Sequence, residues 1–592
     1  MKKPTNIIKK ALGFIAAAFL STAANNAHAV NFLWNNTGTN WTSPTSWTNG
    51  AQPTATTATG TDVVQFGSVG PGNNRVELTS NRTAQKLEFL SGANAYTFTS
   101  ASAKLLEIAS GGITNASSAV QTFDLRVNNS GGSYTWFNAA GGGLTFNQQV
   151  GLTTDSSGTS RTLTLAGDGA YVFNGNLVNN GTSVAPTAKV IYTGNGSIIF
   201  NGTNTIGGVT GGGMDITGGG IVTVNGATGA GQGLVTLGGT SGTTNMPILR
   251  INSTNGLSNL NSLKGSTSLS TMGTLDLLGD NSNSITTYVM NQYQGNNMNF
   301  TNHGGYKTLL QFTNAANVLT ASTASSGGRR LFNNSTNLLV QFDGTIDIGG
   351  TVSDISVIGG EGDFILNGSL LNTGIGVRGL RKDGTGKATM QAANTYNGDT
   401  TITGGTLIVN GSLQSPLTTV SAGATLGGSG SLQGVLLNGG TISAGNSAGL
   451  LSMDTLNASN GNFIFEIGSP NTRGVTYDAI NVTSLLTLGA NTAFTFETLN
   501  NYVYADGNTY DLFDWGSADM SSFNVSVLEA ALPSLASTPD LSWNVSQFTL
   551  DGTVSVSSVP EPSTGSLMAF AVASLITLKV IRRKKCQHQT HS

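Results

Sequence analysis

The fold is set by a short pattern that occurs three times in the second half of the sequence, at Gly405-Thr406-Leu407, Gly423-Ala424-Thr425-Leu426 and Gly440-Thr441-Ile442. The copies begin 18 and 17 residues apart, and each is a glycine turn followed by a short β-rich stretch. Short strands separated by such turns are typical of all-β folds. A regular period of about 18 residues therefore predicts an elongated right-handed parallel β-helix, in which each coil stacks on the last.

The residue types in the pattern predict how such a solenoid is stabilised. Val, Ile and Leu side chains would fill the interior of the stacked coils, and Thr, Ser and Asn side chains would form ladders between them. Glycine would supply positive φ angles at the corners, which other residues adopt at a cost.

A longer repeat is visible around the short one. The segment 167–177 recurs as 360–370 at an offset of 193 residues, and 204–208 recurs as 394–398 at an offset of 190. Matches in the same order at nearly one offset indicate a unit of about 190 residues that occurs twice. The prediction is a single long solenoid.

A family resemblance is carried by the segment Asn394-Thr395-Tyr396-Asn397-Gly398-Asp399-Thr400-Thr401-Ile402-Thr403-Gly404-Gly405-Thr406-Leu407. It is similar to the autotransporter-associated β-strand repeat, whose pattern is roughly Asn-Thr-Tyr-x-Gly-x-Thr-x-Ile-x-x-Gly-x-Leu. The clear match covers about 385–450, and the earlier copy at 204–226 departs from it, with Ile206 in place of tyrosine. The resemblance implies a passenger-like β-helical stalk. Because the sequence lacks the C-terminal run of strands ending in an aromatic residue that autotransporters carry, we do not extend the resemblance to the secretion route.

The composition limits the kinds of functional site that the chain can contain. The chain has 592 residues with 81 glycines, and only 9% of its residues are charged. The one cysteine is Cys586, and among four histidines only His303 lies between residues 30 and 562. Disulfide scaffolds, Cys/His zinc sites and Cys–His nucleophiles are therefore excluded for the mature chain, and a Ser–His–Asp triad would have to use His303. No cofactor is expected.

The first 29 residues predict a secretory signal peptide. Four lysines lie within the first ten residues, and an apolar stretch follows at 11–20. Ala27 and Ala29 then place small residues at the two positions that a signal peptidase recognises, so cleavage is expected after Ala29. The alternative is a short membrane anchor, but ten apolar residues are about half of a membrane span.

The other terminus has three parts in order. The motif Val559-Pro560-Glu561-Pro562 precedes an uncharged apolar segment at 565–578. A basic tail follows, made of Lys579, Arg582, Arg583, Lys584 and Lys585. The apolar segment has the length of a short transmembrane helix, and the positive-inside rule would keep the tail cytoplasmic.

This arrangement resembles the PEP-CTERM sorting signal of Gram-negative bacteria. The resemblance implies an inner-membrane precursor that an exosortase-like protease cuts near the motif and passes to the cell surface or the exopolysaccharide matrix. Two departures bear on the efficiency of processing: Lys579 interrupts the apolar run, and the chain continues past Lys585.

Charge is distributed unevenly between the termini and the body. Residues 30–562 contain 17 basic and 29 acidic side chains, a net charge of −12. A nucleic-acid partner needs a basic face, so nucleic acid is excluded as a partner. An acidic, exported surface protein fits this balance.

The predicted organisation has five segments: a signal peptide at 1–29, a Trp-rich cap with the first coils at 30–160, β-helix repeats at 161–454 that are clearest at 385–450, a β-rich cap at 455–557, and the sorting signal at 558–585. Trp34, Trp41 and Trp47 either seal the open end of the solenoid or stack on sugar rings, and we favour the seal. The C-terminal cap is expected to hold antiparallel-type strands at 463–467, 493–496, 509–513 and 553–556.

Two acidic stretches are candidates for chemistry. Parallel β-helices can carry polysaccharide lyases and glycosidases, which need paired carboxyls, one with a raised pKa. Glu361 and Asp363 are close in sequence, but the earlier copy has Asp168 and Ala170 there, so we interpret them as surface charges. The stretch 506–511 contains oxygen ligands of the type calcium prefers, and a turn between strands explains it equally well.

The sequence predicts an exported surface or extracellular-matrix protein with a structural or adhesive role. Its expected partners are signal peptidase, an exosortase-like protease, the inner membrane before processing, and extracellular polysaccharide or the cell envelope. One alternative is a β-helix enzyme acting on polysaccharide, either a lyase or a glycoside hydrolase. A third hypothesis, a conventional autotransporter passenger, is disfavoured for the reason given above.

Overall fold

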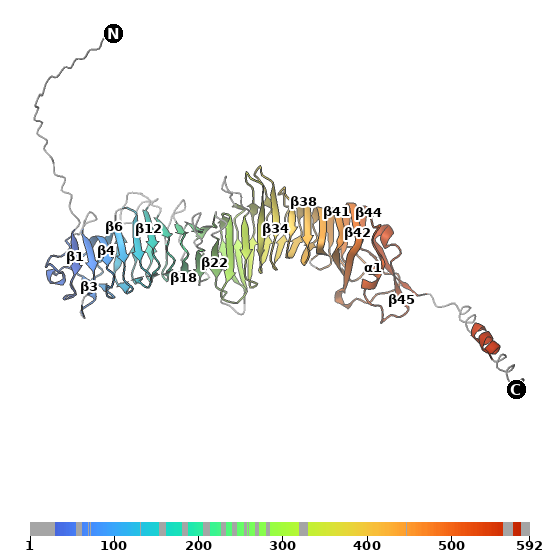
Figure 1. Ribbon diagram of the computed structural model, residues 1–592, viewed down its shortest axis with the longest axis horizontal. Helices are drawn as coiled ribbons and strands as arrows, with labels where there is room; N and C mark the ends of the chain where they lie inside the picture. The colour runs from blue at the N-terminus through green and yellow to red at the C-terminus, as the bar shows by residue number, and fades with distance from the viewer. Residues whose placement is uncertain are drawn as a thin grey trace, which may run out of the picture.

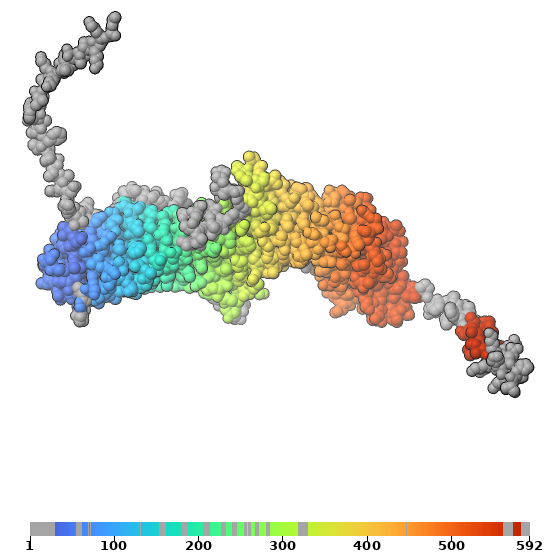
Figure 2. All heavy atoms as spheres, in the orientation of Figure 1, coloured from blue at the N-terminus to red at the C-terminus, as the bar shows by residue number. Residues whose placement is uncertain are grey.

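The described part of the chain forms a long solenoid whose strands follow one another along one axis (Figure 1). The computed structural model describes residues 30–54, 62–68, 70, 73–130, 132–152, 161–179, 188–204, 213–226, 233–238, 246–253, 257, 260–266, 272–279, 284–318, 329–445, 447–559 and 572–581. The surface view shows the chain advancing steadily from one end of the molecule to the other (Figure 2). The all-β, parallel β-helix class predicted from the sequence is confirmed.

Two parallel sheets run along the solenoid. Sheet A contains β1 (Asn31–Trp34), β2 (Val63–Phe66), β4 (Arg82–Phe89), β6 (Leu105–Asn115), β8 (Arg126–Asn129), β9 (Tyr134–Asn138), β11 (Val150–Gly151), β12 (Arg161–Ala166), β14 (Leu177–Val178), β15 (Ala188–Tyr192), β17 (Gly213–Ile216), β19 (Gly233–Leu237), β21 (Leu260–Lys264), β24 (Gln292–Gln294), β27 (Ala316–Val318), β30 (Thr345–Asp347) and β33 (Leu370–Leu371).

Sheet B contains β3 (Arg75–Leu78), β5 (Thr97–Ser100), β7 (Val120–Phe123), β10 (Gly143–Phe146), β13 (Ala170–Phe173), β16 (Ser197–Phe200), β18 (Ile221–Val224), β20 (Ile248–Ile251), β22 (Gly273–Leu277), β23 (Thr286–Met290), β25 (Asn297–Asn302), β26 (Thr308–Phe312), β28 (Arg330–Asn333), β29 (Leu338–Phe342), β31 (Asp354–Gly360), β32 (Asp363–Leu366), β34 (Arg378–Lys382), β35 (Lys387–Met390), β36 (Thr400–Ile402), β37 (Gly405–Val409), β38 (Ser412–Ser421), β39 (Ala424–Gly428), β40 (Ser431–Ala444), β41 (Leu450–Ile467), β42 (Ala479–Thr498) and β44 (Phe513–Asp519).

Coil length changes along the molecule. Near the glycine pattern that occurs three times at 405–442, Asn410 donates to Gln391 of the preceding coil. The two residues are 19 positions apart in the sequence, close to the predicted period. In the first half the coils are longer, because Asn174 donates to Asn147 across 27 residues. The period of about 18 therefore describes the coils near 387–427, and the coils of the first half are longer. The extra residues lie in the connections, since the paired strands stay in parallel register.

The interior is filled by apolar side chains, with phenylalanine adding to the predicted Val, Ile and Leu. A stack of rings runs through successive coils: Phe98, Phe123, Phe146, Phe173 and Phe200. Neighbouring ring centroids in this stack are 4.8, 4.8, 5.2 and 5.2 Å apart, and their planes differ by 20° or less. The strand spacing of a parallel sheet is about 4.8 Å, so identical residues in register stack face to face.

The longer repeat has a structural counterpart. Its first copy places β13 and then the short β14, and its second copy places β32 and then β33 in the same order. The turn before β13 contains Gly167 with a φ of 87°, and Gly360 at the matching place has a φ of 101°. A Cβ atom at either glycine would collide with the carbonyl oxygen of the preceding coil, from Asn138 or Asn333. Glycine is required at both positions for this reason.

The N-terminal end is closed by tryptophan. Trp34, Trp41 and Trp47 are buried, and the ring centroids of Trp34 and Trp47 are 5.0 Å apart. The indole Nε1 of Trp47 donates to the carbonyl oxygen of Trp41 at 2.9 Å. These rings face the core, so they offer no exposed surface to a sugar ring. The short helix η1 (Pro44–Ser46) lies between Trp41 and Trp47.

The C-terminal end differs in part from the prediction. Residues 463–467 and 493–496 lie in β41 and β42, which pair in parallel, so the antiparallel prediction is wrong for them. They continue the solenoid because Phe463 and Phe494 are in register and stack at 5.4 Å. The prediction is confirmed for 509–511 and 553–556: sheet C joins β43 (Thr509–Asp511), β46 (Thr553–Ser558) and β45 (Leu541–Asn544) in antiparallel order. Phe513, by contrast, begins β44 and pairs in parallel with β42.

Few helices accompany the strands. Helix α1 (Ser526–Ala531) packs on β42, α2 (Phe548–Asp551) contacts β44 and β46, and η2 (Leu499–Asn501) is a single turn directly after β42. Residues 572–581 are helical beyond the solenoid (Figure 1). Among the helices that the structure describes, none has both the length and the apolar character that crossing a membrane requires.

Candidate functional site

The targeting residues lie mostly outside the described part of the chain. This holds for Ala27 and Ala29 of the signal peptide, for Pro560, Glu561 and Pro562 of the sorting motif, and for Arg582, Arg583, Lys584 and Lys585 of the basic tail. Val559 is described as exposed at the end of the solenoid, and Lys579 lies in the helix at 572–581. Their predicted roles therefore stay predictions.

The repeat around residue 394 is organised by a buried asparagine. Asn394 is fully buried, and its Oδ1 accepts the backbone N–H of Leu370 on the preceding coil at 2.9 Å. Its Nδ2 donates to the carbonyl oxygens of Ala392 and Ser412. One amide thus satisfies backbone groups on three successive coils at a corner where the sheet ladder is interrupted. Asn204 of the first copy accepts from Leu177 in the same way, at 3.2 Å.

Two further polar side chains are buried in this repeat. The hydroxyl of Tyr396 lies 2.7 Å from the hydroxyl of Thr400, and burial raises the pKa of Tyr396 well above its usual value. The ammonium of Lys382 donates to the carbonyl oxygens of Asp383, Gly384 and Gly404. Burial lowers the pKa of Lys382 to about 8, against the opposing effect of nearby carboxylates. The lysine therefore fastens two turns of neighbouring coils together.

Comparison with known proteins agrees with this geometry. Residues 380–409, which contain Lys382, Asn394 and Tyr396, match a family model described as the passenger-associated-transport-repeat. No curated protein and no solved structure matches the chain. The chain thus carries a passenger-type repeat inside a parallel β-helix, and the sequence-based resemblance is supported for this segment.

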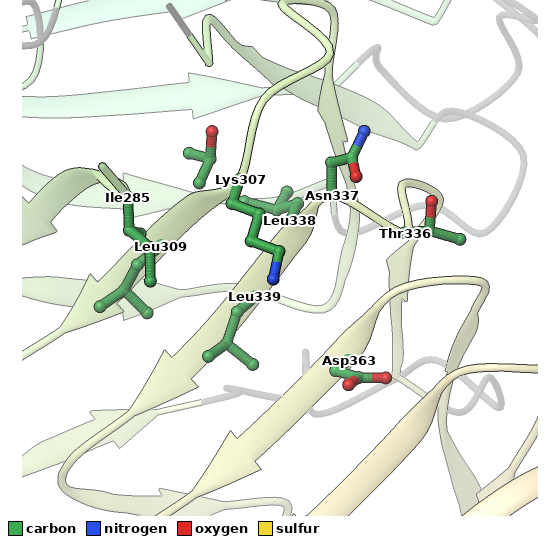
Figure 3. A pocket seen from close by; sticks show the side chains of 9 residues that line it. Ile285, Lys307, Leu309, Thr336, Asn337, Leu338, Leu339 and Asp363 are labelled. Atoms are coloured by element: carbon green, nitrogen blue, oxygen red, sulfur yellow. The ribbon is translucent and has the colours of Figure 1, made fainter. Parts of the chain in front are cut away.

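A shallow groove lies on the outer face of sheet B (Figure 3). It has a volume of about 330 Å³ and crosses four successive coils. It is lined by Ile285, Lys307, Thr308, Leu309, Thr336, Asn337, Leu338, Leu339 and Asp363. Ile285 is 58% exposed, and Leu309 and Leu339 are half-buried beside each other in register. Figure 3 shows the Lys307 side chain extending across this apolar floor, with Asp363 farther along the groove.

Amide side chains lie next to the groove on the same face. Asp343 accepts hydrogen bonds from the amides of Gln311, Gln341 and Asn367. Burial acts to raise the pKa of Asp343, but these hydrogen bonds outweigh it and hold the pKa below its usual value. A charged carboxylate with three fixed amides leaves this part of the face rigid and polar.

A second acidic group lies near the C-terminal end. Asp478 is buried, and its carboxylate accepts the backbone N–H groups of Gly449 at 2.7 Å and Glu466 at 2.8 Å. Burial, with Glu466 and Glu497 nearby, raises the pKa of Asp478 to about 7. Burial and Glu497 also raise the pKa of Glu466. Both oxygens of Asp478 are used by the backbone, so this carboxyl holds the connection between β41 and β42 in place.

The carboxylates singled out from the sequence do not form a catalytic pair or a metal site, although Asp363 lines the groove. Glu361 lies in an exposed turn, and Asp363 begins β32 and accepts the backbone N–H of Lys387 at 2.8 Å. They are therefore not two residues on one face of a strand. Asp506 accepts the backbone N–H of Ser558 at 2.8 Å, as expected for a turn between strands. Within the described ranges, no group of three His, Cys, Asp or Glu side chains is arranged to hold a metal ion.

His303 is placed beside an acid but not beside a nucleophile. Its Nδ1 lies 3.1 Å from Oδ1 of Asp276, and its Nε2 lies 3.1 Å from Oδ1 of Asn252. In a catalytic triad the second nitrogen faces a serine hydroxyl, and here an amide oxygen occupies that place. The contacts described for His303 thus give no triad.

The roles of three polar residues were not predicted from the sequence: Lys307 in the groove, Lys382 in the repeat, and Asp478 near the C-terminal end. Lys382 had a usable signal, because alternation along the strand puts it on the same side as the buried Leu380. Lys307 and Asp478 carry no such signal, since their positions depend on which coils become neighbours.

Proposed function

We propose that the protein is an exported, elongated surface protein with a structural or adhesive role in the cell envelope or extracellular matrix. The observation that carries this proposal is the passenger-type repeat at 380–409, built into a parallel β-helix. A solenoid of this kind is elongated and presents a long outer face, as a stalk requires. The proposed role requires no catalytic activity.

The route to the surface is the finer part of the proposal. Signal peptidase would remove residues 1–29 after Ala29, and the apolar segment at 565–578 would hold the precursor in the inner membrane. An exosortase-like protease would then cut near Pro560-Glu561-Pro562. The order of motif, apolar segment and basic tail supports this route.

Mass spectrometry of envelope and extracellular fractions from the native organism tests the route. The expected result is a surface or secreted form whose last peptide ends near Pro562, with residues 563–592 missing. Full-length protein that retains Cys586 in the inner membrane would contradict the exosortase step, and it would leave the stalk as a simple C-terminally anchored protein.

The adhesive part of the proposal concerns extracellular polysaccharide. The groove of sheet B combines an apolar floor of Ile285, Leu309 and Leu339 with one cation and one anion, Lys307 and Asp363. Aliphatic side chains can pack on the carbon face of a sugar ring while polar groups around them bind hydroxyls. The groove crosses several coils, so a chain of sugars lying along the axis would contact several neighbouring strands.

Affinity electrophoresis through a gel containing the native exopolysaccharide tests this contact. The wild-type protein is expected to be retarded, and Leu339→Asp and Lys307→Ala are expected to migrate faster. Lys104→Ala is the matched control, because Lys104 lies outside the groove, directly before β6 in the N-terminal part of the solenoid. Equal retardation of all four proteins would contradict a contact in the groove.

An enzyme acting on polysaccharide is the second candidate, because Glu466 and Glu497 lie in register on neighbouring coils, and burial together with Glu497 raises the pKa of Glu466. A general acid in a glycosidase needs such a carboxyl. Incubation of the purified protein with a polysaccharide panel, with product detected by reducing-end and unsaturation assays, separates the two functions. Turnover that is lost in Glu466→Gln would establish the enzyme, and absence of product would favour the structural role.

A further inference from the structure

Four aliphatic side chains are exposed together on two turns of the solenoid, one leading into β31 and the next leading into β34. They are Val352, Ile355, Ile375 and Val377, and Ile375 is 88% exposed. We call these four side chains the apolar patch. Exposed apolar side chains that gather in one place, rather than singly, mark an interaction site on a soluble protein.

The two turns are stacked directly on each other. The backbone N–H of Gly376 donates to the carbonyl oxygen of Gly350 at 2.9 Å, and that of Asp354 donates to the carbonyl oxygen of Val377 at 2.9 Å. The strands that follow continue this stacking, since β31 and β34 pair in parallel register. The apolar patch is therefore one continuous surface that spans two coils.

The turn that carries Ile375 is held in one conformation. Nδ2 of Asn372 donates to the carbonyl oxygen of Gly376 at 2.7 Å, which closes the turn on itself. Asp347 of the preceding coil accepts hydrogen bonds from the backbone N–H and the hydroxyl of Thr373. A side chain on such a preorganised turn loses little conformational freedom on binding, so its burial is available for affinity.

The charge that solvent reaches around the apolar patch is acidic. Asp399 is exposed on the next coil, and its backbone lies against Gly379, which faces Ile355 in register. The two cations behind the patch, Arg329 and Arg378, are both buried. An apolar patch with an acidic border is complementary to a surface that is apolar and carries a cation.

The groove of sheet B has both of these properties. Its floor is formed by Leu309 and Leu339, with Ile285 at the edge, and Lys307 extends across it (Figure 3). Among the described residues, no carboxylate lies within ion-pair distance of the Lys307 ammonium. The carboxylate of Asp363, farther along the groove, already accepts a backbone N–H of the next coil.

The apolar patch and the groove lie on different sides of the coil. The chain passes through β31, β32 and β33 before the turn at 372–377 leads into β34, which pairs with β31. The groove lies on the series β26, β29 and β32, whereas the patch lies at the corner between β33 and β34. One copy therefore cannot place its own patch in its own groove, and both are open to other copies.

We propose that the apolar patch of one copy docks into the sheet B groove of a second copy, with Lys307 facing the acidic border of the patch. The groove volume of about 330 Å³ has room for the side chains of Ile375 and Val377. The contact is heterologous, so a pair of copies keeps one free patch and one free groove, and further copies can add side by side.

This association goes beyond the proposed surface role, because it gives the protein a second copy of itself as a partner. Polysaccharide and the second copy would compete for the same groove. Four side chains in a small groove bury less than the roughly 1,200 Å² of a stable interface. Each contact is therefore weak, and association depends on protein concentration.

Disulfide cross-linking of the full-length protein tests the docking. All variants carry Cys586→Ser, which removes the one native cysteine. Copies with Ile375→Cys, mixed under mild oxidation with copies carrying Leu339→Cys, are expected to form a linked dimer. Val503→Cys replaces Ile375→Cys in the matched control, because Val503 is 70% exposed near the C-terminal end. A yield no higher than this control would overturn the docking, as would efficient linking of Ile375→Cys copies to each other, which would place patch against patch.

Sedimentation velocity in mild detergent separates this proposal from the polysaccharide contact. The sedimentation coefficient of the wild type is expected to rise with concentration, and Ile375→Asp is expected to lose this rise while Val503→Asp keeps it. Ile375→Asp should still be retarded as strongly as the wild type in the exopolysaccharide gel, because Ile375 lies outside the groove. A wild-type coefficient independent of concentration, or an equal rise in Ile375→Asp, would overturn the self-association and leave the polysaccharide contact standing.

Discussion

The side-chain oxygen of Asn394 and the backbone nitrogen of Leu370 are 2.9 Å apart, on neighbouring coils, and both groups are buried. Asn204 and Leu177 form the same contact in the first copy of the long repeat. A buried asparagine at this corner therefore replaces a strand-to-strand hydrogen bond where the backbone turns. This contact explains why asparagine opens the recurring Asn-Thr pattern in both copies.

We predict that Asn394→Ala destabilises the solenoid locally. The substitution leaves the N–H of Leu370 without its acceptor, and an unsatisfied buried donor costs roughly 1–3 kcal/mol. Hydrogen exchange read by mass spectrometry should show lost protection in peptides covering 366–371. Asn410→Ala is the control, because the contacts of its amide are exposed: Nδ2 donates to Gln391, and Oδ1 accepts the backbone N–H of Ser429 at 3.4 Å. Equal protection in Asn394→Ala and wild type would contradict the role of Asn394.

Much of the fold could be predicted because its causes are local. The glycines at 167 and 360 stand where a Cβ atom would collide with the preceding coil, so the sequence shows them twice at one offset. Apolar and polar residues alternate along some short strands, as at Gly143–Phe146, where the buried Leu144 and Phe146 flank Thr145, and this alternation reveals the inward face. Periodicity and glycine position are properties of the chain itself, and they carry the β-helix prediction.

The features that could not be predicted from the sequence depend on contacts between coils. The length of a coil is set by its connections, so the period of 18 read at 405–442 does not give the longer coils of the first half. The orientation of 463–467 could not be read from its own residues, because parallel and antiparallel strands have the same alternation. Lys307 and Leu339 likewise meet in one groove only because two coils are stacked.

We predict that Lys382 makes stability depend on pH in the alkaline range. Burial lowers its pKa to about 8, below the value of 10.5 in an unfolded chain, so between these values the unfolded state binds more protons than the folded state. The free energy of unfolding should therefore rise from pH 8 to pH 10.5, by roughly 3 kcal/mol if the whole shift is realised.

Urea denaturation of Lys382→Met across this pH range checks the prediction. The variant should lack the alkaline rise that the wild type shows. Lys387→Met is the matched control, because Lys387 is exposed five residues away and should leave the rise unchanged. A rise that persists in Lys382→Met would assign it to another group.

We predict that Glu497→Gln stabilises the C-terminal end at neutral pH. Burial, together with Glu466 and Glu497, raises the pKa of Asp478 from 3.8 to about 7, so its stabilising contribution is present below pH 4 and is lost as pH rises through 7. Removing the charge of Glu497 weakens the repulsion, and a gain of roughly 0.2–1 kcal/mol is expected for such an exposed charge. Thermal unfolding should show the gain at pH 7.5 and little change at pH 4. Glu529→Gln on α1 is the control, and an equal gain there would point to net charge instead.

We predict that the phenylalanine stack carries much of the stability of the first half. Phe146 lies between Phe123 at 4.8 Å and Phe173 at 5.2 Å, and it is fully buried. Phe146→Ala removes contacts with both neighbours and leaves a cavity, which typically costs 3–5 kcal/mol. Phe137→Ala is the matched control, since Phe137 is 41% exposed on the neighbouring sheet.

Because each coil contacts mainly its two neighbours, limited proteolysis should detect Phe146→Ala as early cleavage between residues 120 and 175, with the region after 380 still protected. Uniform loss of protection along the whole chain would show instead that the solenoid unfolds as one cooperative unit.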